Sequence, residues 1–305
     1  MAVSKSFVIW AERYLQNKHF GKHQECNTRC LIDKVTRFED EHKHPMNIDS
    51  MTADDLRVFA DFLSSDYDIS MNTIVTNMTL MRTVCNWVRK QGVTNNDPFF
   101  GYDMPKALYG TPYFLTIQER DQVLDADLTD DAELAEYRDM FVFQCMVGCR
   151  HSDLVTFTPK NIIDGVLEYI PIKTKGKLGD VVRVPLIPKA MAILDGHDHG
   201  DDEPIFPKHY NFKFNDAIRR ILKRAKVNRV VTVINPKTRL EEKKPISDVA
   251  TSHLARRTFI GNLYRMVKDP DLVASMSGHA KGSVAFARYR VIDDDMKKSL
   301  VELIQ

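Results

Sequence analysis

The sequence carries arginine, histidine and tyrosine residues of the types needed to hold a phosphodiester and attack it. Phosphoryl transfer asks a protein mainly for positioning and for positive charge at the non-bridging oxygens of the phosphate. An arginine guanidinium is planar, keeps its charge and can bind two phosphate oxygens at once. The candidates, in chain order, are Arg150, His253, Arg256, His279 and Tyr289. Together they would supply two guanidiniums, two imidazoles and a phenol.

The spacing of these residues favours a common site. His253 and Arg256 are three residues apart, about one helical turn, so their side chains would share a helix face. His279 follows Gly278, and Tyr289 stands ten residues after His279. Each residue type also has a common structural role, such as a surface ion pair or an aromatic anchor, and only the set predicts a site.

Tyr289 is the candidate nucleophile. A phenol has a pKa of about 10, so it must lose its proton as it attacks phosphorus. We assign that proton to His253, and we expect His279 to hydrogen-bond the phosphate. The chain has ten tyrosines, and the competing candidates are Tyr169, Tyr210 and Tyr264.

The leaving oxygen needs a proton, and a lysine on a loop is suited to give it. Lys173, Lys175 and Lys177 all lie in one predicted turn, and any of them could instead be solvated. The residues alone do not choose among the three.

Length and composition predict a soluble protein of two domains. A chain of 305 residues can bury two cores, and its 43% hydrophobic and 28% charged residues are typical of globular proteins. The sequence has no run of 18 or more apolar residues and no leader with a cleavage site, so we expect an intracellular protein. Its five cysteines are odd in number and lack CxxC spacing, which predicts buried, reduced thiols.

Charge is distributed unevenly along the chain, although the net charge is only +1. Residues 205–264 contain 14 Lys and Arg against 4 Asp and Glu, a net charge of +10. Residues 117–139 contain 2 Lys and Arg against 9 Asp and Glu, a net charge of −7. This asymmetry predicts a basic face for phosphates beside an acidic, solvated face, although a basic stretch can also be a surface helix without a partner.

The first hundred residues predict helices. Apolar residues recur at helical spacing over 7–15 and 56–62, the second run following Thr52, which is typical of an N-cap. A third helix is predicted over 70–90, ending at Gly92. Proline and glycine then become frequent, which indicates a linker. We therefore expect a helical first domain over 1–97, a linker over 98–114 and a second domain over 115–305.

The second domain is predicted to mix helices with a small antiparallel sheet. Thr116 and Glu119 form a capping-box pattern that opens a helix, and another helix is predicted over 131–147. Alternating apolar residues over 166–172 and 181–186 predict a β-hairpin after a short strand at 162–163. Helices are predicted over 189–194 and 211–226, and 230–244 is either a second hairpin or a basic loop. A short amphipathic helix is expected near 293–304.

This order of motifs resembles the tyrosine recombinases of the phage-integrase family. The resemblance rests on Arg150, a hairpin lysine, His253 and Arg256 at HxxR spacing, Gly278-His279, and Tyr289. It covers about 115–289 and, more loosely, the helical first half, which is similar to a core-binding domain. The segments 97–99 and 149–154 resemble integrases of mobile elements from the Bacteroides group. The match of Ile172-Lys173-Thr174 to the family's lysine step selects Lys173, and Asp153 fits an acidic position that would orient positive charge.

The resemblance implies a site-specific recombinase that acts in DNA integration and recombination. The two domains would clamp a duplex, Tyr289 would form a 3′-phosphotyrosine, and a 5′-hydroxyl would reverse it without metal, ATP or another cofactor. It also implies four protomers on two double-stranded DNA sites, joined through the C-terminal helix, in the cytoplasm of a bacterial or phage-infected cell. Many integrases carry an additional N-terminal domain for arm sites. A helix starting near Phe7 leaves no room for one before it, so we expect either a simpler recombinase or a truncated chain.

Four other interpretations remain open at this point. Type IB topoisomerases use similar chemistry to relax DNA, and a regulator could keep the fold and bind DNA without cutting, although the complete residue set argues against the regulator. A zinc site could be formed by His19, His23, Cys26 and Cys30, which are closely spaced, but structural zinc usually joins two separated ligand pairs. Cys149 beside His151 is a weak candidate for a thiol nucleophile, because neighbours in sequence rarely face each other on a helix.

Overall fold

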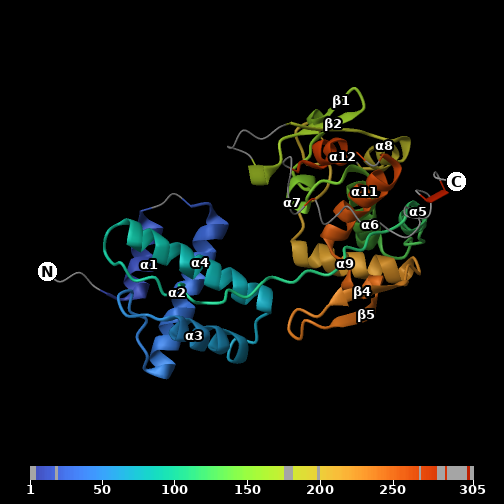
Figure 1. The fold of residues 1–305 in the computed structure, drawn as a ribbon. Helices are drawn as coiled ribbons and strands as arrows, with labels where there is room; N and C mark the ends of the chain where they lie inside the picture. The colour runs from blue at the N-terminus through green and yellow to red at the C-terminus, as the bar shows by residue number, and fades with distance from the viewer. Residues whose placement is uncertain are drawn as a thin grey trace. The chain divides into compact units, whose positions relative to one another are not determined.

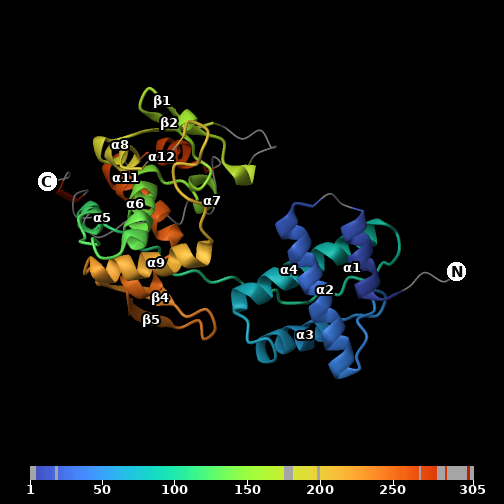
Figure 2. The same ribbon diagram turned by 180° about the vertical axis from the view of Figure 1, so that it is seen from behind.

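The computed structural model describes residues 5–17, 20–174, 181–197, 200–267, 269–279, 286 and 301–302. The chain divides into two compact units, one with residues 1–109 and 234–241 and the other with residues 110–233 and 242–305. Figures 1 and 2 show these units from opposite sides. Helices dominate, and the described strands form two small sheets, which confirms the predicted fold class.

The first unit is helical, as predicted. Its described helices are α1 (Phe7–Gln16), α2 (Lys22–His42), α3 (Ala53–Ser65) and α4 (Met71–Lys90). Thr52 and Asp55 form a capping box at the start of α3, and the Ser70 side chain accepts a hydrogen bond from Thr73 N at the start of α4. These caps satisfy backbone donors that a helix leaves unpaired at its N-terminus.

A core joins the four helices of the first unit. Its fully buried members include Phe7, Leu31, Phe38, Leu56, Phe59, Met78 and Val84. Burial of each large apolar side chain contributes about 1.5–3 kcal/mol, so this cluster is the main source of stability in the unit. The core of the second unit is a separate cluster.

The helix α2 is the element of the first unit that the sequence pattern does not predict, although it has 21 residues. Its buried side chains, Thr28, Leu31, Ile32, Val35 and Phe38, form a narrow stripe, and polar residues fill the rest of its surface. A narrow apolar stripe on a charged helix gives a weak periodic signal.

The second unit contains the remaining described elements, drawn from green to red in Figure 1. Its helices are α5 (Ile117–Leu124), α6 (Ala132–Val147), α7 (His151–Leu154), α8 (Pro188–Asp195), α9 (Asn211–Arg224), α10 (Ile246–Val249), α11 (Ser252–Val267) and α12 (Pro270–Ser277). Its strands are β1 (Ile162–Ile163), β2 (Val166–Tyr169), β3 (Val182–Pro185), β4 (Val230–Ile234) and β5 (Glu241–Pro245). The tip between β4 and β5 is assigned to the first unit.

The helix α6 is central to the second unit. It is buried on nearly all sides from Met140 to Val147, and α5, α9 and α11 pack around it (Figures 1 and 2). The predicted capping box of Thr116 and Glu119 starts α5, and the Asp131 side chain accepts from Leu134 N at the start of α6. Because α6 ends beside α11, it brings the two arginine motifs together.

The first sheet has the order β1-β2-β3 and is antiparallel, with Tyr169 opposite Val182 at its end. The strands are shorter than predicted. Beyond Tyr169 the chain passes Pro171 and forms a 3₁₀ turn at Ile172–Thr174 instead of continuing the strand. Proline has no N–H for the ladder and restricts the residue before it, which accounts for the early end of β2.

Of the two alternatives for 230–244, the hairpin is confirmed. The strands β4 and β5 pair in a two-stranded sheet, and Asn235 N donates to Leu240 O at 2.9 Å. The Asn235 side chain accepts from Lys237 N at 2.8 Å and from Thr238 N at 3.0 Å, an arrangement that holds the turn.

The expected separation of a basic face and an acidic face is wrong in part, because the two stretches meet. Arg220 pairs with Asp131 at 2.8 Å, and Arg224 pairs with Asp130 at 2.5 Å. Arg229 pairs with Glu119 at 2.7 Å. Much of the positive charge on α9 is therefore neutralised within the unit.

The expectation that all cysteines are buried is wrong for two of them. Cys26 and Cys30 on α2 are exposed, whereas Cys85, Cys145 and Cys149 are buried. All five are free thiols, as predicted. Within the described part of the chain, no helix is both long enough and apolar enough to cross a membrane.

Candidate active site

A glycine turn places Arg150 at the edge of a pocket. The helix α6 ends at Gly148, which has a φ of 68°. This conformation favours glycine. A Cβ atom at Gly148 would also lie 2.2 Å from the ring of Phe259 on α11, so the turn requires glycine for space as well. Arg150 follows as the N-cap residue of α7.

The guanidinium of Arg256 is held by the same turn. Arg256 is only 2% exposed, and its Nη1 donates to the carbonyl oxygen of Gly148 at 2.7 Å. Its Nη2 lies 3.0 Å from His279 Nδ1 and 3.1 Å from His279 Nε2. The Ser277 hydroxyl is 2.9 Å from His279 Nδ1 and fixes that ring further. The structure thus joins Arg256, His279 and the end of α6.

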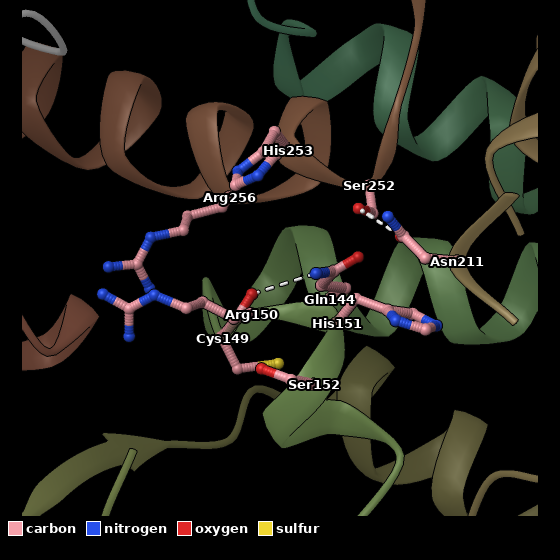
Figure 3. Close-up of a pocket in the computed structure, with 9 residues that line it drawn as sticks. All are labelled: Gln144, Cys149, Arg150, His151, Ser152, Asn211, Ser252, His253 and Arg256. Carbon is pink, nitrogen blue, oxygen red and sulfur yellow. Dashed lines mark hydrogen bonds between the residues drawn. The ribbon is translucent and has the colours of Figure 1, made fainter. Parts of the chain in front are cut away.

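The two arginines line one pocket of about 280 Å³. Figure 3 shows their guanidiniums beside each other at one end of it. Its lining residues are Gln144, Cys149, Arg150, His151, Ser152, Asn211, Ser252, His253 and Arg256. Within the described part of the chain, this lining contains no carboxylate. Two neighbouring cations without a lining anion are suited to bind one from solution.

Asp153 is a buried carboxylate that faces both Arg150 and the turn that carries Lys173. It is 1% exposed, and its Oδ2 is 3.9 Å from Arg150 Nη1. Its Oδ1 accepts a hydrogen bond from Ile172 N at 2.9 Å. Ile172 begins the 3₁₀ turn that carries Lys173, which is exposed. One carboxylate therefore hydrogen-bonds to the lysine turn and forms an ion pair with Arg150.

Burial, together with the cations of the site, lowers the pKa of both imidazoles, which are therefore neutral at pH 7. Loss of hydration lowers the pKa of His253, and the charges of Arg257, Arg256, Arg150 and Lys173 lower it further. For His279, loss of hydration followed by the charges of Arg256, Arg150 and Lys173 lowers the pKa to about 3. Burial and a nearby like charge both disfavour a protonated imidazole. A neutral His253 is in the form that accepts a proton.

The structure brings together five of the predicted site residues, namely Arg150, Asp153, His253, Arg256 and His279. Lys173 is close enough to act on the pKa of both imidazoles. Tyr289, Lys175, Lys177 and most of the expected C-terminal helix lie outside the described residues. Phe286, three residues before Tyr289, is buried, and its ring centroid is 5.2 Å from that of His279. The roles of these residues stay predictions.

Sequence reasoning missed the polar residues on the far side of the pocket. Gln144 is 1% exposed and donates through Nε2 to Cys149 O at 3.0 Å. Asn211 accepts from the Ser252 hydroxyl at 3.2 Å, and Asn215 accepts from Ser252 N at 2.8 Å, which fixes the start of α11. The signal for Gln144 was a single amide within the apolar run of α6.

The alternative nucleophiles do not have suitable environments. Burial raises the pKa of the Cys149 thiol, which keeps it protonated. Burial also raises the pKa of Tyr169, a competing tyrosine that is buried at the end of β2.

The zinc alternative finds no support in the described part of the chain. Among the described residues, no group of three or more His, Cys, Asp or Glu could hold a metal ion. His19, part of the suggested zinc cluster, lies outside them.

Comparison with known families identifies the family of the chain. A sequence model described as the phage integrase family matches residues 113–296, which is more than half of the chain. The chain belongs to the phage integrase family. A second model, the phage integrase SAM-like domain, matches residues 6–104 of this integrase-family protein. The family predicted from the motifs is therefore confirmed.

Solved integrase structures share the fold of this integrase-family protein. The Tn1549 transposon integrase in complex with a circular intermediate DNA is 15% identical, with a TM-score of 0.73 over 98% of this chain and 100% of that one. A lambda integrase dimer bound to a COC′ core site is 14% identical, with a TM-score of 0.68 over 94% and 95%. A lambda integrase tetramer bound to a Holliday junction is 14% identical, with a TM-score of 0.68 over 94% of this chain and 78% of that one. Comparison with curated proteins finds no match.

Proposed function

We propose that this protein is a site-specific DNA recombinase that cuts and rejoins strands through a phosphotyrosine intermediate. The observation that carries the proposal is the convergence of the Arg150 and Arg256 guanidiniums in a pocket whose described lining has no carboxylate. Two guanidinium groups can bind the non-bridging oxygens of one phosphate and stabilise their charge in the transition state. The positive charge comes from the protein, so we propose a reaction that needs neither metal nor ATP.

The neighbouring residues supply the proton transfers. The Tyr289 oxygen attacks phosphorus and gives its proton to neutral His253, while the bond from phosphorus to the 5′ oxygen breaks. Lys173 donates a proton to that 5′ oxygen. The products are a 3′-phosphotyrosine and a 5′-hydroxyl, and attack by the 5′-hydroxyl of a partner strand reverses the step.

The position of Phe286 supports Tyr289 as the nucleophile. Phe286 packs on His279, which contacts Arg256. Three residues of chain span at most about 11 Å, so a nucleophile at position 289 is compatible with an anchor at Phe286.

Assembly and setting are proposed from the likeness to integrases. The lambda integrase structure on a Holliday junction is a tetramer, and the Tn1549 protein is a transposon integrase bound to circular intermediate DNA. We propose that four copies of this chain act on two duplexes, joined through the C-terminal segment, and that they move a mobile element in the cytoplasm.

A nicked suicide duplex tests the cutting step. The duplex is first selected from a random pool by the wild-type protein, and a nick beside the cleaved bond lets the short strand diffuse away. We expect a covalent protein–DNA adduct in a denaturing gel, formed in the presence of EDTA and lost in Tyr289→Phe. Tyr264→Phe, which replaces a different tyrosine of the same unit, is the matched control and should retain the adduct. An adduct that persists in Tyr289→Phe would assign the nucleophile elsewhere.

Joining of two distinct duplexes separates recombination from topoisomerase activity. A recombinase exchanges strands between a labelled and an unlabelled duplex. Relaxation of supercoiled DNA without exchanged products would support the topoisomerase alternative, and sequence-selective binding without an adduct would support a regulator.

Replacement of the bridging 5′ oxygen by sulfur identifies the acid. A thiolate leaves without a proton, so this substrate should restore cleavage by Lys173→Ala to near the wild-type rate. Lys175→Ala and Lys177→Ala should cleave the ordinary duplex normally. Restoration in either of those variants, and not in Lys173→Ala, would move the role to that lysine.

A further inference from the structure

An exposed aromatic pair stands at the start of α9, next to the pocket. Tyr210 is 75% exposed and Phe212 is 68% exposed. Their rings stack with centroids 6.0 Å apart and planes inclined by 24°. Asn211 lies between them in sequence and lines the pocket on the side away from the arginines (Figure 3). Contiguous exposed apolar surface beside a binding pocket marks a surface for a partner.

The chain on both sides of the aromatic pair is anchored. His209 Nδ1 is 2.9 Å from the hydroxyl of Tyr137 on α6, and His209 Nε2 is 3.1 Å from Glu136 Oε1. Phe214, one turn into α9, is fully buried. The two rings are therefore presented from a fixed backbone, which lowers the entropy lost when a partner binds.

Free positive charge lies at the same end of α9. The cations further along this helix pair with carboxylates, in the ion pairs Arg219–Asp216, Arg220–Asp131, Lys223–Asp248 and Arg224–Asp130. Lys208 and Lys213 are exposed and form no ion pair with any residue that the structure describes. No side chain caps the first turn of α9, so the positive end of the helix dipole adds to their charge.

We propose that this α9 tip, made of Lys208, Tyr210, Phe212 and Lys213, enters the major groove of the duplex and that its two rings select thymine. The proposal rests on the proposed function, since the duplex is the one whose phosphate occupies the pocket. In the major groove, the apolar group on a base-pair edge is the methyl group of thymine. The two lysines match the flanking phosphates. Because Asn211 lines the pocket, the selected base pairs lie next to the cleaved phosphate.

Selection from a random duplex pool tests the thymine preference. Sequences bound by the wild-type protein are compared with those bound by the double variant Tyr210→Ala/Phe212→Ala, and the cleaved bond is mapped from the covalent adduct. We expect thymine enrichment close to that bond in the wild-type set. The variant should lose this enrichment and keep preferences elsewhere.

A second measurement needs no variant. Each thymine near the cleaved bond is replaced by uracil, which lacks only the methyl group. We expect the affinity of the wild-type protein to fall about 3- to 10-fold at one or two positions, since each buried methyl group contributes about 0.8 kcal/mol. The double variant should bind the thymine and uracil duplexes equally.

Two lysines of one helix provide a matched test of the charge. Lys213→Ala should reduce the slope of log affinity against log salt concentration by about one, because one phosphate contact is lost. Lys223→Ala removes an ammonium that pairs with Asp248 at 2.8 Å and should leave the slope unchanged. Equal slopes for Lys213→Ala and the wild type would overturn this part of the proposal.

The outcomes separate this inference from the proposed function. Equal affinity of the wild-type protein for the thymine and uracil duplexes would overturn the inference alone, as would identical enrichment by wild type and double variant. A wild-type protein that enriches no sequence and forms no adduct would overturn the proposed function, and the inference with it.

Discussion

Arg150 and Arg256 differ in how much of each guanidinium already bonds to the protein. Arg256 is held by Gly148 O and His279. Arg150 Nη1 is buried without a hydrogen-bond partner among the described residues, and its nearest anion, Asp153, is 3.9 Å away. The Arg150 side chain is 22% exposed, whereas Arg256 is buried. The guanidinium of Arg150 is therefore more available to a phosphate, and the guanidinium of Arg256 is more firmly held by the protein.

The first prediction concerns replacement of either arginine by lysine. Arg150→Lys and Arg256→Lys should each slow adduct formation about 100- to 1000-fold, because an ammonium cannot hold two oxygens in a planar fork. Arg220→Lys, which changes an ion-paired arginine on α9, is the control and should react at the wild-type rate. The rate is measured with the suicide duplex. Slowing of less than threefold in both site variants would argue against the two-fork site.

The second prediction concerns protons and anion binding. The lowered pKa values of His253 and His279 are partly due to cations, so a bound anion should raise both. Between pH 6.5, the approximate ordinary pKa, and the lowered values, sulfate binding should take up protons and strengthen as the pH falls. Calorimetry of sulfate binding in buffers of different ionisation enthalpy measures the uptake.

The same shifts fix the sign of the pH dependence of stability. Because folding lowers both pKa values, the unfolded chain binds more protons in this window, and the two imidazoles reduce stability as the pH falls below about 6.5.

For the sulfate-binding experiment, the control variant His279→Asn should show less proton uptake than the wild type. Proton release by the wild type would contradict the prediction.

At the scale of elements, the turn between α6 and α7 is the most constrained part of the site. Gly148 combines a positive φ with a close approach to Phe259, and its carbonyl holds Arg256. Gly165 has a similar φ of 73°, but a Cβ atom there would meet nothing within 4 Å. Alanine substitutions at these two glycines therefore separate the free-energy cost of the backbone conformation from the cost of a steric contact with Phe259.

The third prediction compares alanine at these two positions. Gly165→Ala should lower the free energy of unfolding by about 1 kcal/mol, the cost of the backbone conformation. Gly148→Ala should lower it by about 2–5 kcal/mol, because overpacking against Phe259 adds to that cost. Denaturant unfolding measures both values. Equal losses in the two variants would show that the contact with Phe259 relaxes freely.

The elements show which sequence signals carried structural information. Caps predicted the starts of α3 and α5, since Thr52 and Thr116 bond as the sequence pattern requires. The wrong extension of β2 came from reading Ile170 and Ile172 as a continued alternation across Pro171. The polar helix α2 was missed because its buried stripe is narrow.

The site could be predicted to a similar extent. The arginines and histidines were found because their chemistry is unusual, and family resemblance supplied Lys173 and Asp153. Gln144 and Asn211 were missed because an amide at an ordinary helix position carries no chemical signal of its own. The contact of the acidic stretch with α9 depends on tertiary packing, which a charge count along the sequence does not contain.

At the scale of the whole molecule, each unit has its own core, which makes separate unfolding the natural expectation. Phe59 of the first core and Phe143 of the second are both fully buried. The two residues offer matched changes in different units.

The fourth prediction follows from these separate cores. Phe59→Ala and Phe143→Ala should each cost about 3–5 kcal/mol, and each should lower only one of two thermal transitions. Differential scanning calorimetry of the full chain measures both transitions. A single transition that shifts equally in both variants would show that the units unfold together.

The uneven distribution of accessible thiols has a practical consequence. Cys26 and Cys30 are one turn apart on a helix of the first unit, whereas both cysteines of the second unit are buried. A maleimide dye added to the native protein should therefore label the first unit and spare the second, without any engineered cysteine. Fluorescence from that dye would then report on the helical unit by itself while nucleic acid is bound and released.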